Sequence, residues 1–435
     1  MVSAVCAFAK TGEAARAAGA GISDAQAQAM WDAAWNMLFS PRTNLFYDHI
    51  SSYEPSKRFQ YLPKPEEVAA LYPNYSGFGT GMEDSMILAG LALSAVIDRF
   101  EVEKDPSMKI YADKVLSGIE LCSTVHKSRG FIARSVCIFD AKSTYVGSSR
   151  DQFIHALFGL WKYYNSPLCD APTKRRIAAI TSAVGERMLK YMTAENGFDY
   201  RRSDGVPCAR GLSKMWNVRP HEAARLPMFY AIAWRTTGDG RFLTEYKKYA
   251  APALEESLKL SADNPSWVST QMMSSLIVLG DVETDPALLE KIKTAKALLA
   301  KFDNRKLKTA CAEFFKTAEN FDMSMVAPDW RKSKIWTHET PRWGDYYKVW
   351  FAGRKVGELA WSSIEGSIDP DALKAFCSVV AATDYSRTSS CSIIHQLAAY
   401  WALRTRSACA GAPPSFGAAR SAGFDSFGAR HLLRK

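Results

Sequence analysis

A helical period runs through almost the whole chain. From about residue 23 onward, apolar side chains recur at the spacing of an α-helix, while the alternating pattern of a strand is rare. In the first such segment, the residues on one face are Ala27, Met30, Trp31, Ala34, Trp35 and Leu38. Ser23 or Asp24 precedes them as a cap. We therefore expect an all-α protein.

Two kinds of helix are expected to alternate along the chain. The segment from Glu83 to Phe100 is apolar on every side, which is typical of a helix covered by neighbours all round, whereas other segments are more polar. The other expected helices are 109–126, 150–164, 172–194, 221–236, 241–260, 266–279, 286–302, 305–317, 356–363, 370–382 and 390–408. An irregular, aromatic-rich stretch is expected at 321–353. About a dozen helices in antiparallel pairs indicate one continuous core and suggest a ring.

One short phrase occurs twice between helices. Gly130-Phe131-Ile132-Ala133-Arg134 and Gly197-Phe198-Asp199-Tyr200-Arg201 each follow a predicted outer helix and precede an inner one. Recurrence of this kind favours repeated helical hairpins, although two copies also arise by coincidence.

The ends of the chain differ from its body. We expect one helical domain over 23–408, an N-terminal extension over 1–22 and a flexible tail over 409–435, where Gly, Ala, Ser and Arg dominate. The stretch from Val2 to Ala9 resembles the end of a secretory signal, but no charged region precedes it. A secreted or periplasmic location and a cytoplasmic one both stay open. No apolar run is long enough for a membrane helix.

Composition and charge narrow the classes of partner. The 435 residues are 47% hydrophobic and 23% charged, as in a soluble globular protein. The formal net charge of +10 is scattered among acids, so nucleic acid is not expected, and an acidic carbohydrate fits the same excess. Nine cysteines show no Cys-x-x-Cys pair, which predicts reduced core thiols and no structural zinc.

Several common catalytic signatures are missing from the sequence. There is no phosphate-binding Gly-x-x-x-x-Gly-Lys-Ser/Thr, no dinucleotide fingerprint after a strand and no Gly-x-Ser-x-Gly elbow. We expect neither a cofactor nor a metal. His221-Glu222, with Arg225 one turn later, heads a predicted inner helix but lacks the second histidine of a zinc-binding helix.

Carboxylates gather at the starts of predicted inner helices. Glu83, Asp84 and Asp151 hold such positions, and a pair of carboxyl groups is what cleavage of a glycosidic bond requires. The alternative is that they cap the helices or compensate their dipoles. Asp151 stands out because Arg150, Gln152 and His155 crowd the same helix start, a setting that controls charge; a solvated ion pair would look the same.

A second dense region is the expected loop Trp336–Tyr347. It combines aromatic rings with His338, Glu339, Arg342, Trp343 and Asp345, the residue types with which proteins bind sugars. The alternative is a rigid loop that its tryptophans pack onto the ring.

Together these features resemble the six-hairpin glycosidases, whose fold is the (α/α)6 toroid, over about residues 20–405. More narrowly, Gly79-Thr80-Gly81-Met82-Glu83-Asp84 and Ser148-Ser149-Arg150-Asp151-Gln152 resemble bacterial proteins related to β-glucuronidases and unsaturated glucuronyl hydrolases. The resemblance implies action on glycans that contain uronic acid, with Asp84 and Asp151 at the positions of the working aspartates. This chain has Glu83-Asp84 where an Asp-Asp or Asp-Gly pair is more typical.

Three functions follow as hypotheses. The first is a glycoside hydrolase with Asp151 as acid or base and Glu83, Asp84 or Glu339 as its partner; His338 completes the candidate catalytic set. The second is a lyase on the same substrates that uses His221 or His338 and a tyrosine such as Tyr145. The third is a non-catalytic glycan-binding protein. The residues expected to bind the sugar are Arg150, Gln152, His155, Tyr145, Arg201, His221, Trp267, Arg342, Trp343 and Asp345.

Overall fold

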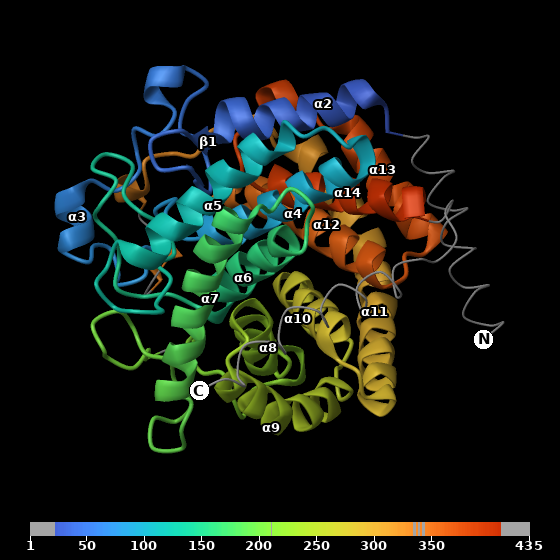
Figure 1. Cartoon of the computed structure of the whole chain (residues 1–435). Helices are drawn as coiled ribbons and strands as arrows, with labels where there is room; N and C mark the ends of the chain where they lie inside the picture. The colour runs from blue at the N-terminus through green and yellow to red at the C-terminus, as the bar shows by residue number, and fades with distance from the viewer. Residues whose placement is uncertain (1–21, 210, 334–335, 338–339, 342–343, 410–435) are drawn as a thin grey trace, which may run out of the picture.

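The fold is all-α. The computed structural model describes residues 22–209, 211–333, 336–337, 340–341 and 344–409 (Figure 1). Within these ranges the strands are two-residue pairs: β1 (Phe39–Ser40) with β2 (Leu45–Phe46), and β3 (Trp336–Thr337) with β4 (Thr340–Pro341). The remaining elements are helices and short helical turns. The predicted extension over 1–21 and the tail over 410–435 lie outside the described residues.

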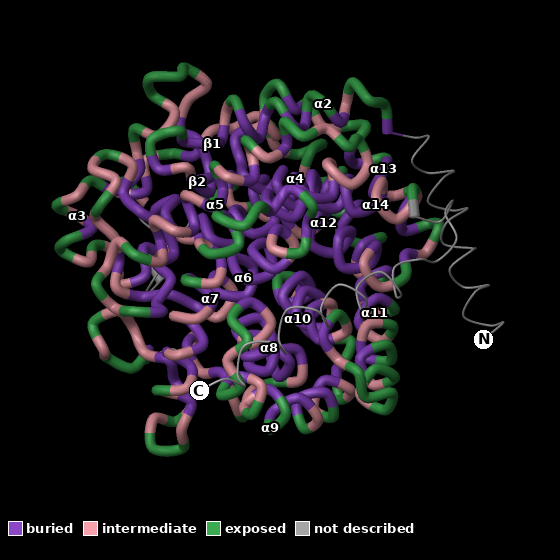
Figure 2. The backbone as a smooth tube through the Cα atoms, viewed as in Figure 1, coloured by how far each residue is buried: buried purple, intermediate pink, exposed green. Residues whose placement is uncertain are grey.

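Six helices, called the inner helices here, are buried along most of their length. They are α4 (Ser85–Glu103), α6 (Arg150–Tyr164), α8 (Arg225–Thr237), α10 (Ser269–Val282), α12 (Asp345–Gly366) and α14 (Ile393–Cys409). Each inner helix contacts the next one in chain order, and α14 packs back against α4. Figure 2 shows that buried backbone concentrates on these helices. Most of their buried apolar residues belong to one hydrophobic cluster that runs from Ile22 to Leu403, whereas Tyr346 and Trp350 of α12 form a smaller cluster with Ala327 and Trp330.

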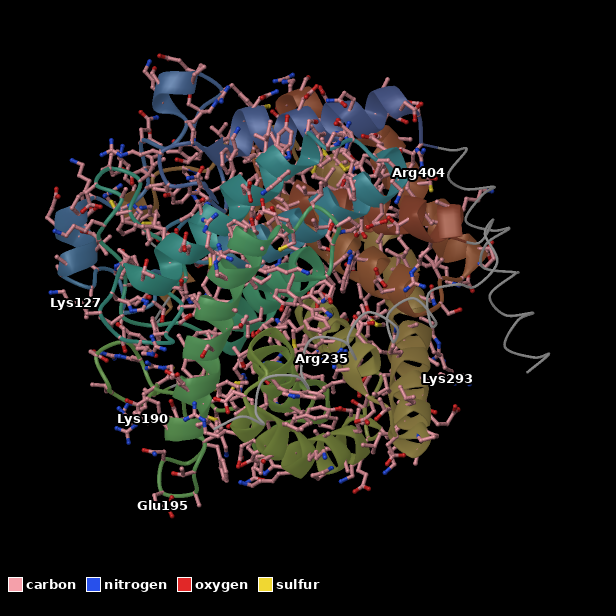
Figure 3. All side chains as sticks on the ribbon, in the orientation of Figure 1. Lys127, Lys190, Glu195, Arg235, Lys293 and Arg404 are labelled. Atoms are coloured by element: carbon pink, nitrogen blue, oxygen red, sulfur yellow. The ribbon has the colours of Figure 1, made fainter. Side chains whose placement is uncertain are left out.

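A second set of helices, the outer helices, covers the inner ones. They are α2 (Asp24–Asp32), α5 (Met108–Thr124), α7 (Ala171–Tyr191), α9 (Gly240–Ser257), α11 (Pro286–Asn320) and α13 (Pro370–Ala382). The outer helices α5 to α13 each pack on the inner helix that precedes them in the chain, and α2 packs on α14. A short helix, α3 (Pro65–Ala69), lies in the connection before α4. Charged side chains such as Lys190, Glu195 and Lys293 are exposed at the edge of the molecule (Figure 3).

The starts of the outer and inner helices differ chemically. Ser23, Asp170, Asp239, Asp285 and Asp369 cap outer helices with their side chains. The N-cap residues of α4, α6, α8, α10 and α12 make no such bond. Asp84 and Asp151 are therefore not capping side chains. The first amide groups of α4 and α6 bond to other residues instead, as Met86 N–H does to Gln152 and Arg150 N–H to the carbonyl of Leu212. The positive dipole end of each inner helix still favours an anion.

Two predicted elements are corrected. The expected helices 286–302 and 305–317 form the single helix α11, because Asp303 at the supposed break is buried and accepts hydrogen bonds from Ser269 (3.0 Å) and Ser362 (2.7 Å). The stretch 345–353, expected to be irregular, is the first half of α12, where Tyr346 and Trp350 are buried. Aromatic residues at helical spacing pack there against neighbouring elements.

The repeated phrase occupies equivalent places. Gly130 (φ 72°) and Gly197 (φ 60°) adopt the left-handed conformation in the loops after α5 and α7. The rings that follow, Phe131 and Tyr200, both pack against Phe153 on α6, with centroids 6.0 and 4.7 Å away. The two loops therefore hold α6 from two sides.

Close approach of α4 and α6 depends on glycine. A Cβ atom at Gly90 would lie 1.9 Å from the carbonyl oxygen of His155. We expect Gly90→Ala to lower the free energy of unfolding by about 1–3 kcal/mol or more, because two packed helix backbones must move apart. Gly280→Ala on α10 is the matched control, since the nearest atom would lie at an ordinary 3.6 Å. Urea denaturation tests the pair; equal stability of both variants would show that α4 and α6 are not in this contact.

Candidate functional site

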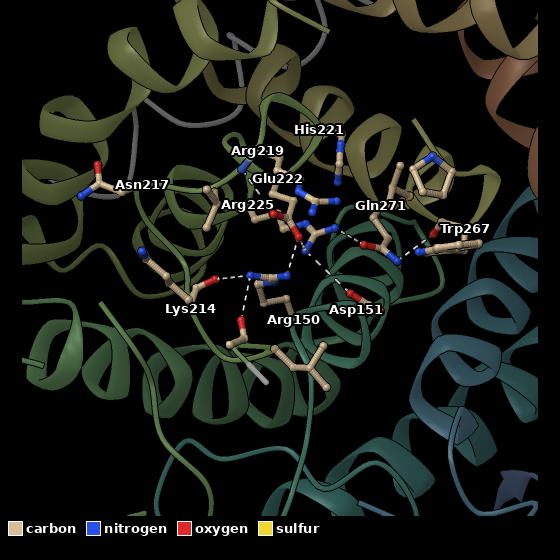
Figure 4. Close-up of a pocket in the computed structure, with 15 residues that line it drawn as sticks. Arg150, Asp151, Lys214, Asn217, Arg219, His221, Glu222, Arg225, Trp267 and Gln271 are labelled. Carbon is tan, nitrogen blue, oxygen red and sulfur yellow. Dashed lines mark hydrogen bonds and ion pairs between the residues drawn. The ribbon is translucent and has the colours of Figure 1, made fainter. Parts of the chain in front are cut away.

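A cavity of about 510 Å³ opens at the starts of three inner helices, α6, α8 and α10 (Figure 4). The helical turns η3 (Pro220–Glu222) and η4 (Ser266–Val268) precede α8 and α10 and contribute to its wall. Most of its lining side chains are polar. Those used below are Arg150, Asp151, Lys214, Arg219, His221, Glu222, Arg225, Trp267 and Gln271.

Two arginines share one carboxylate at the floor of the cavity. Glu222 accepts a hydrogen bond from Nη2 of Arg150 through Oε1, which also lies 3.3 Å from Nη1 of Arg225. The backbone N–H of Arg219 donates to the other oxygen of Glu222 at 3.3 Å. Arg150 is fixed further by the carbonyls of Gly211 (3.1 Å) and Lys214 (2.7 Å). These contacts join the start of α6 to the segment that leads into α8.

Arg225 is the most deeply buried charge of the cavity, with its side chain 1% exposed. Burial, followed by the nearby charge of Arg150, lowers its pKa to about 10, so it stays protonated at neutral pH. Its Nη2 donates to Gln271 on α10, and Nη1 lies 3.7 Å from the carboxylate of Asp151. Arg225 thus connects the starts of α6, α8 and α10.

Asp151 is the more accessible of the two cavity carboxylates. Its side chain is 30% exposed, compared with 11% for Glu222, and it forms a loose ion pair of 3.7 Å with Arg225. Both carboxylates contact the same Arg225 nitrogen, so their nearest oxygens are at most about 7 Å apart. This upper limit admits the separation found in retaining glycosidases and the lower end of the range found in inverting glycosidases.

The cavity carries more cations than anions. Four basic side chains face two carboxylates, and His221 stays neutral at pH 7 because burial lowers its pKa to about 4. Glu222 opposes that shift, whereas Arg225, Arg219 and Arg150 reinforce it. The carboxylates contact Arg150 and Arg225, which leaves the charges of Lys214 and Arg219 available to an anionic ligand.

An aromatic ring stands at the edge of the cavity. Trp267 is 45% exposed, and its carbonyl accepts a hydrogen bond of 2.8 Å from Gln271. Its indole lies 6.3 Å from the ring of Phe351 on α12. An exposed ring that is anchored in this way is a suitable surface for the apolar face of a sugar.

A second polar cluster lies inside the molecule around Asp84. The carboxylate of Asp84 accepts hydrogen bonds from Arg354 on α12 and from Gln152 on α6 (2.9 Å), and it lies 3.4 Å from Arg134. Asp48 accepts from the backbone N–H groups of Glu83 (2.9 Å) and Asp84 (3.0 Å). The cluster therefore ties together the starts of α4 and α6 and the middle of α12.

Glu83 and Asp84 differ in their protonation. Burial and then the charge of Asp84 raise the pKa of Glu83 to about 7. Burial alone would also raise the pKa of Asp84, but Arg354, Arg134 and Gln152 outweigh it and hold that pKa below its usual value. Neighbouring carboxyl groups with separated pKa values are typical of acid–base pairs, and also of buried ion networks.

The residues predicted from the sequence fall into distinct places. Arg150, Asp151, His221 and Trp267 line the cavity, whereas Glu83, Asp84 and Gln152 belong to the buried cluster beside it. The two regions are electrostatically linked, because Asp151 and Asp84 both act to raise the pKa of His155, which burial keeps at about 4. His155 is itself buried and bonded to Thr270 (3.0 Å).

Other predicted residues lie outside the cavity lining. The Tyr145 hydroxyl donates to the carbonyl of Tyr72 (2.5 Å), Arg201 binds Asn196 (2.6 Å), and the exposed Asp345 pairs with Lys348 (2.9 Å). Each of these three has a local structural role. The candidates His338, Glu339, Arg342 and Trp343 lie outside the described residues.

The sequence-based site omitted several residues of the cavity. Glu222 and Arg225 belong to the polar segment that the sequence shows after Pro220, but neither was predicted as a site residue. No sequence pattern indicated Lys214 or Gln271. Their proximity to Asp151 depends on packing of α8 and α10 against α6, which no local pattern reports.

Glu222 is expected to matter for stability more than Asp151. Glu222→Gln should lower the free energy of unfolding on the order of 3 kcal/mol, because two largely buried guanidinium groups lose their shared partner. Asp151→Asn is the matched control, and we expect it to cost less than about 1 kcal/mol since its ion pair is longer and partly solvated. Equal urea midpoints for the two variants would contradict the assignment of Glu222 as the shared partner.

His221 should remain neutral in mildly acidic solution. Its folded pKa lies below the usual 6.5, so the protonated imidazole is disfavoured in the folded protein. In a ¹H–¹⁵N NMR titration we expect its ring signals to stay those of a neutral imidazole from about pH 8 down to about pH 5. A midpoint near the ordinary value would mean that the imidazole is solvated and not enclosed by the cavity.

Neither a metal site nor a membrane-spanning helix is indicated in the described part of the chain. No group of three or more His, Cys, Asp or Glu residues there could hold a metal ion, and no described helix is long and apolar enough to cross a membrane. Comparisons with protein-family models, curated proteins and solved structures find no match to this chain.

Proposed function

We propose that this chain is a glycoside hydrolase that binds an acidic sugar in the cavity at the starts of α6, α8 and α10. The observation that carries the proposal is the composition of the cavity. Lys214 and Arg219, which contact no carboxylate of the described residues, line the same cavity as the accessible Asp151 and the exposed ring of Trp267. A uronic acid offers a carboxylate to the cations and an apolar ring face to the indole.

The arrangement of helices supports an (α/α)6 toroid as the framework of this enzyme. Six inner helices contact one another in cyclic order, and each is covered by an outer helix. In such a ring the starts of the inner helices lie together at one rim. The cavity, at three of those starts, lies where such a rim would place a site.

Asp151 and Glu222 are the proposed pair of carboxyl groups. Glu222, which contacts two guanidinium groups, is proposed as the base or as the stabiliser of positive charge on the sugar ring. Asp151 is the more accessible carboxyl group, so it is proposed to donate a proton to the glycosidic oxygen as that bond breaks. Water then adds to the anomeric carbon in place of the leaving group and gives its proton to a carboxylate of the pair. Asp84 accepts a hydrogen bond from Gln152 and so helps to fix the start of α6.

A lyase on the same substrates is the second candidate, favoured by the state of His221. A neutral imidazole beside several cations is suited to remove the proton next to a uronate carboxylate, because the cations stabilise the negative charge that develops. Elimination would leave a 4,5-unsaturated sugar and no added water.

Replacement of Asp151 tests the proposed hydrolase directly. Asp151→Asn should lower the rate of reducing-sugar release from a glucuronate-containing oligosaccharide by about 10²- to 10⁴-fold, since a positioned proton donor is lost. Thermal unfolding should stay nearly unchanged. Ultraviolet absorbance of the product separates the reactions, because only the lyase forms a conjugated double bond.

Two outcomes would contradict the hydrolase. Full turnover by Asp151→Asn on a substrate that the parent cleaves would remove Asp151 from the chemistry. A parent that binds uronate glycans but releases no product would support the glycan-binding alternative instead.

A further inference from the structure

Gln271 is bound at both ends of its side chain. Its Oε1 accepts a hydrogen bond from Nη2 of Arg225, and its Nε2 donates to the carbonyl of Trp267 at 2.8 Å. A guanidinium group can only donate and a carbonyl can only accept, so these two partners fix which terminal atom of the amide is which. Because Gln271 is 1% exposed, the surrounding protein also restricts its side chain.

The two partners of Gln271 belong to different parts of the cavity. Arg225 is buried at its floor, where it lies 3.3 Å from the carboxylate of Glu222 and 3.7 Å from that of Asp151. Trp267 stands at its edge, with an exposed ring. Gln271 therefore connects the charged floor with the residue that carries the aromatic ring, through two consecutive hydrogen bonds (Figure 4).

The place of the indole matters for a ligand that must reach both parts. An aromatic ring attracts the apolar face of a sugar only at contact distance, whereas the carboxylates must reach the glycosidic bond of the same sugar. The ring of Trp267 lies against Phe351, and the backbone of Trp267 is held by Gln271. Loss of the amide of Gln271 would remove the bonds that tie Trp267 to the floor through this residue.

We propose that Gln271 is a positioning residue for sugar binding. By holding Trp267 to the buried Arg225, it keeps the indole at the distance from the two carboxylates that one bound sugar unit requires. This proposal rests on the proposed function of the cavity and deepens it, because it names the group through which the aromatic surface and the carboxylate pair act on the same ligand.

Calorimetric binding of glucuronate to the full chain, in a double-mutant cycle with Trp267, tests the proposal. Gln271→Met has a similar length and no charge but can form neither hydrogen bond. We expect it to weaken glucuronate binding about three- to tenfold, the range of a single aromatic contact. In a Trp267→Ala background the same substitution should change the affinity less than about twofold, because no indole is left to position.

Ser274→Ala is the matched control on the same helix. The hydroxyl of Ser274 is buried and donates to the carbonyl of Thr270 at 2.7 Å, within α10. Ser274 does not belong to the cavity lining. The variant should therefore bind glucuronate as the parent does.

A second variant of Gln271 covers the case in which Gln271→Met fails to fold, because it leaves a buried donor of Arg225 without its acceptor. Gln271→Glu keeps an oxygen for Arg225 but has no N–H group for the carbonyl of Trp267. Its negative charge weakens the binding of an anion in both backgrounds, so this contribution cancels in the cycle. The loss that disappears together with the indole should again be about three- to tenfold.

The position of the indole can also be followed without a ligand, by ¹⁹F NMR of the chain labelled with 5-fluorotryptophan. The signal that is missing from Trp267→Phe identifies Trp267. We expect this signal to shift in both Gln271 variants and to stay at its parental position in Ser274→Ala.

The results separate failure of this inference from failure of the proposed function. An equal loss of glucuronate affinity with and without the indole, or full affinity in both Gln271 variants, would overturn the positioning role while the acidic-sugar site stands. A Trp267 signal that is identical in the parent and both variants would overturn the link between Gln271 and Trp267 independently of any ligand. If the parent does not bind glucuronate, the proposed function itself fails, and the positioning role with it.

Discussion

The carboxylate of Asp84 holds the starts of α4 and α6 against the middle of α12. It receives hydrogen bonds from Gln152 on α6 and Arg354 on α12, and it sits at the start of α4 beside Arg134. Burying a charge is costly unless partners compensate it, so this carboxylate requires all of these groups to be in place together. Gln152, the residue after Asp151, is one of the partners of Asp84. The position of Asp151 in the cavity therefore depends on a buried interaction outside the cavity lining.

The outer and inner helices differ in which groups bond to their first backbone amides. Asp or Ser side chains accept hydrogen bonds from the first backbone amides of every outer helix except α5, which stabilises each of these helices locally. The inner helices begin instead with residues that bond to neighbouring helices, as Gln152 does when its side-chain oxygen accepts from the backbone N–H of Met86 (3.2 Å). Helix starts that rely on other helices are held only in the folded molecule. Polar groups at the starts of α6, α8 and α10 meet at the cavity.

Electrostatics distinguishes the cavity from the rest of the surface. The net charge of +10 is spread over the chain and does not identify a partner. Inside the cavity, however, Arg225 is buried, Glu222 neutralises part of the local charge, and His221 is kept neutral. The other two cations of the lining, the half-buried Lys214 and the exposed Arg219, can be reached by an anion from solvent.

The sequence by itself determined the all-α class, most helix bounds and the polar character of several helix starts, because helical periodicity and capping residues are local patterns. It also singled out Arg150, Asp151, His221 and Trp267, which line one cavity. It misread α11 as two helices, since the burial of Asp303 depends on Ser269 and Ser362 from other helices. Only the tertiary structure shows that Arg150 contacts Glu222, 72 residues away. It also shows that Asp84 lies in a buried cluster with Arg354 and does not line the cavity. Ion pairs of this kind form when helices pack, and their partners are set by distance in space and not by spacing along the chain.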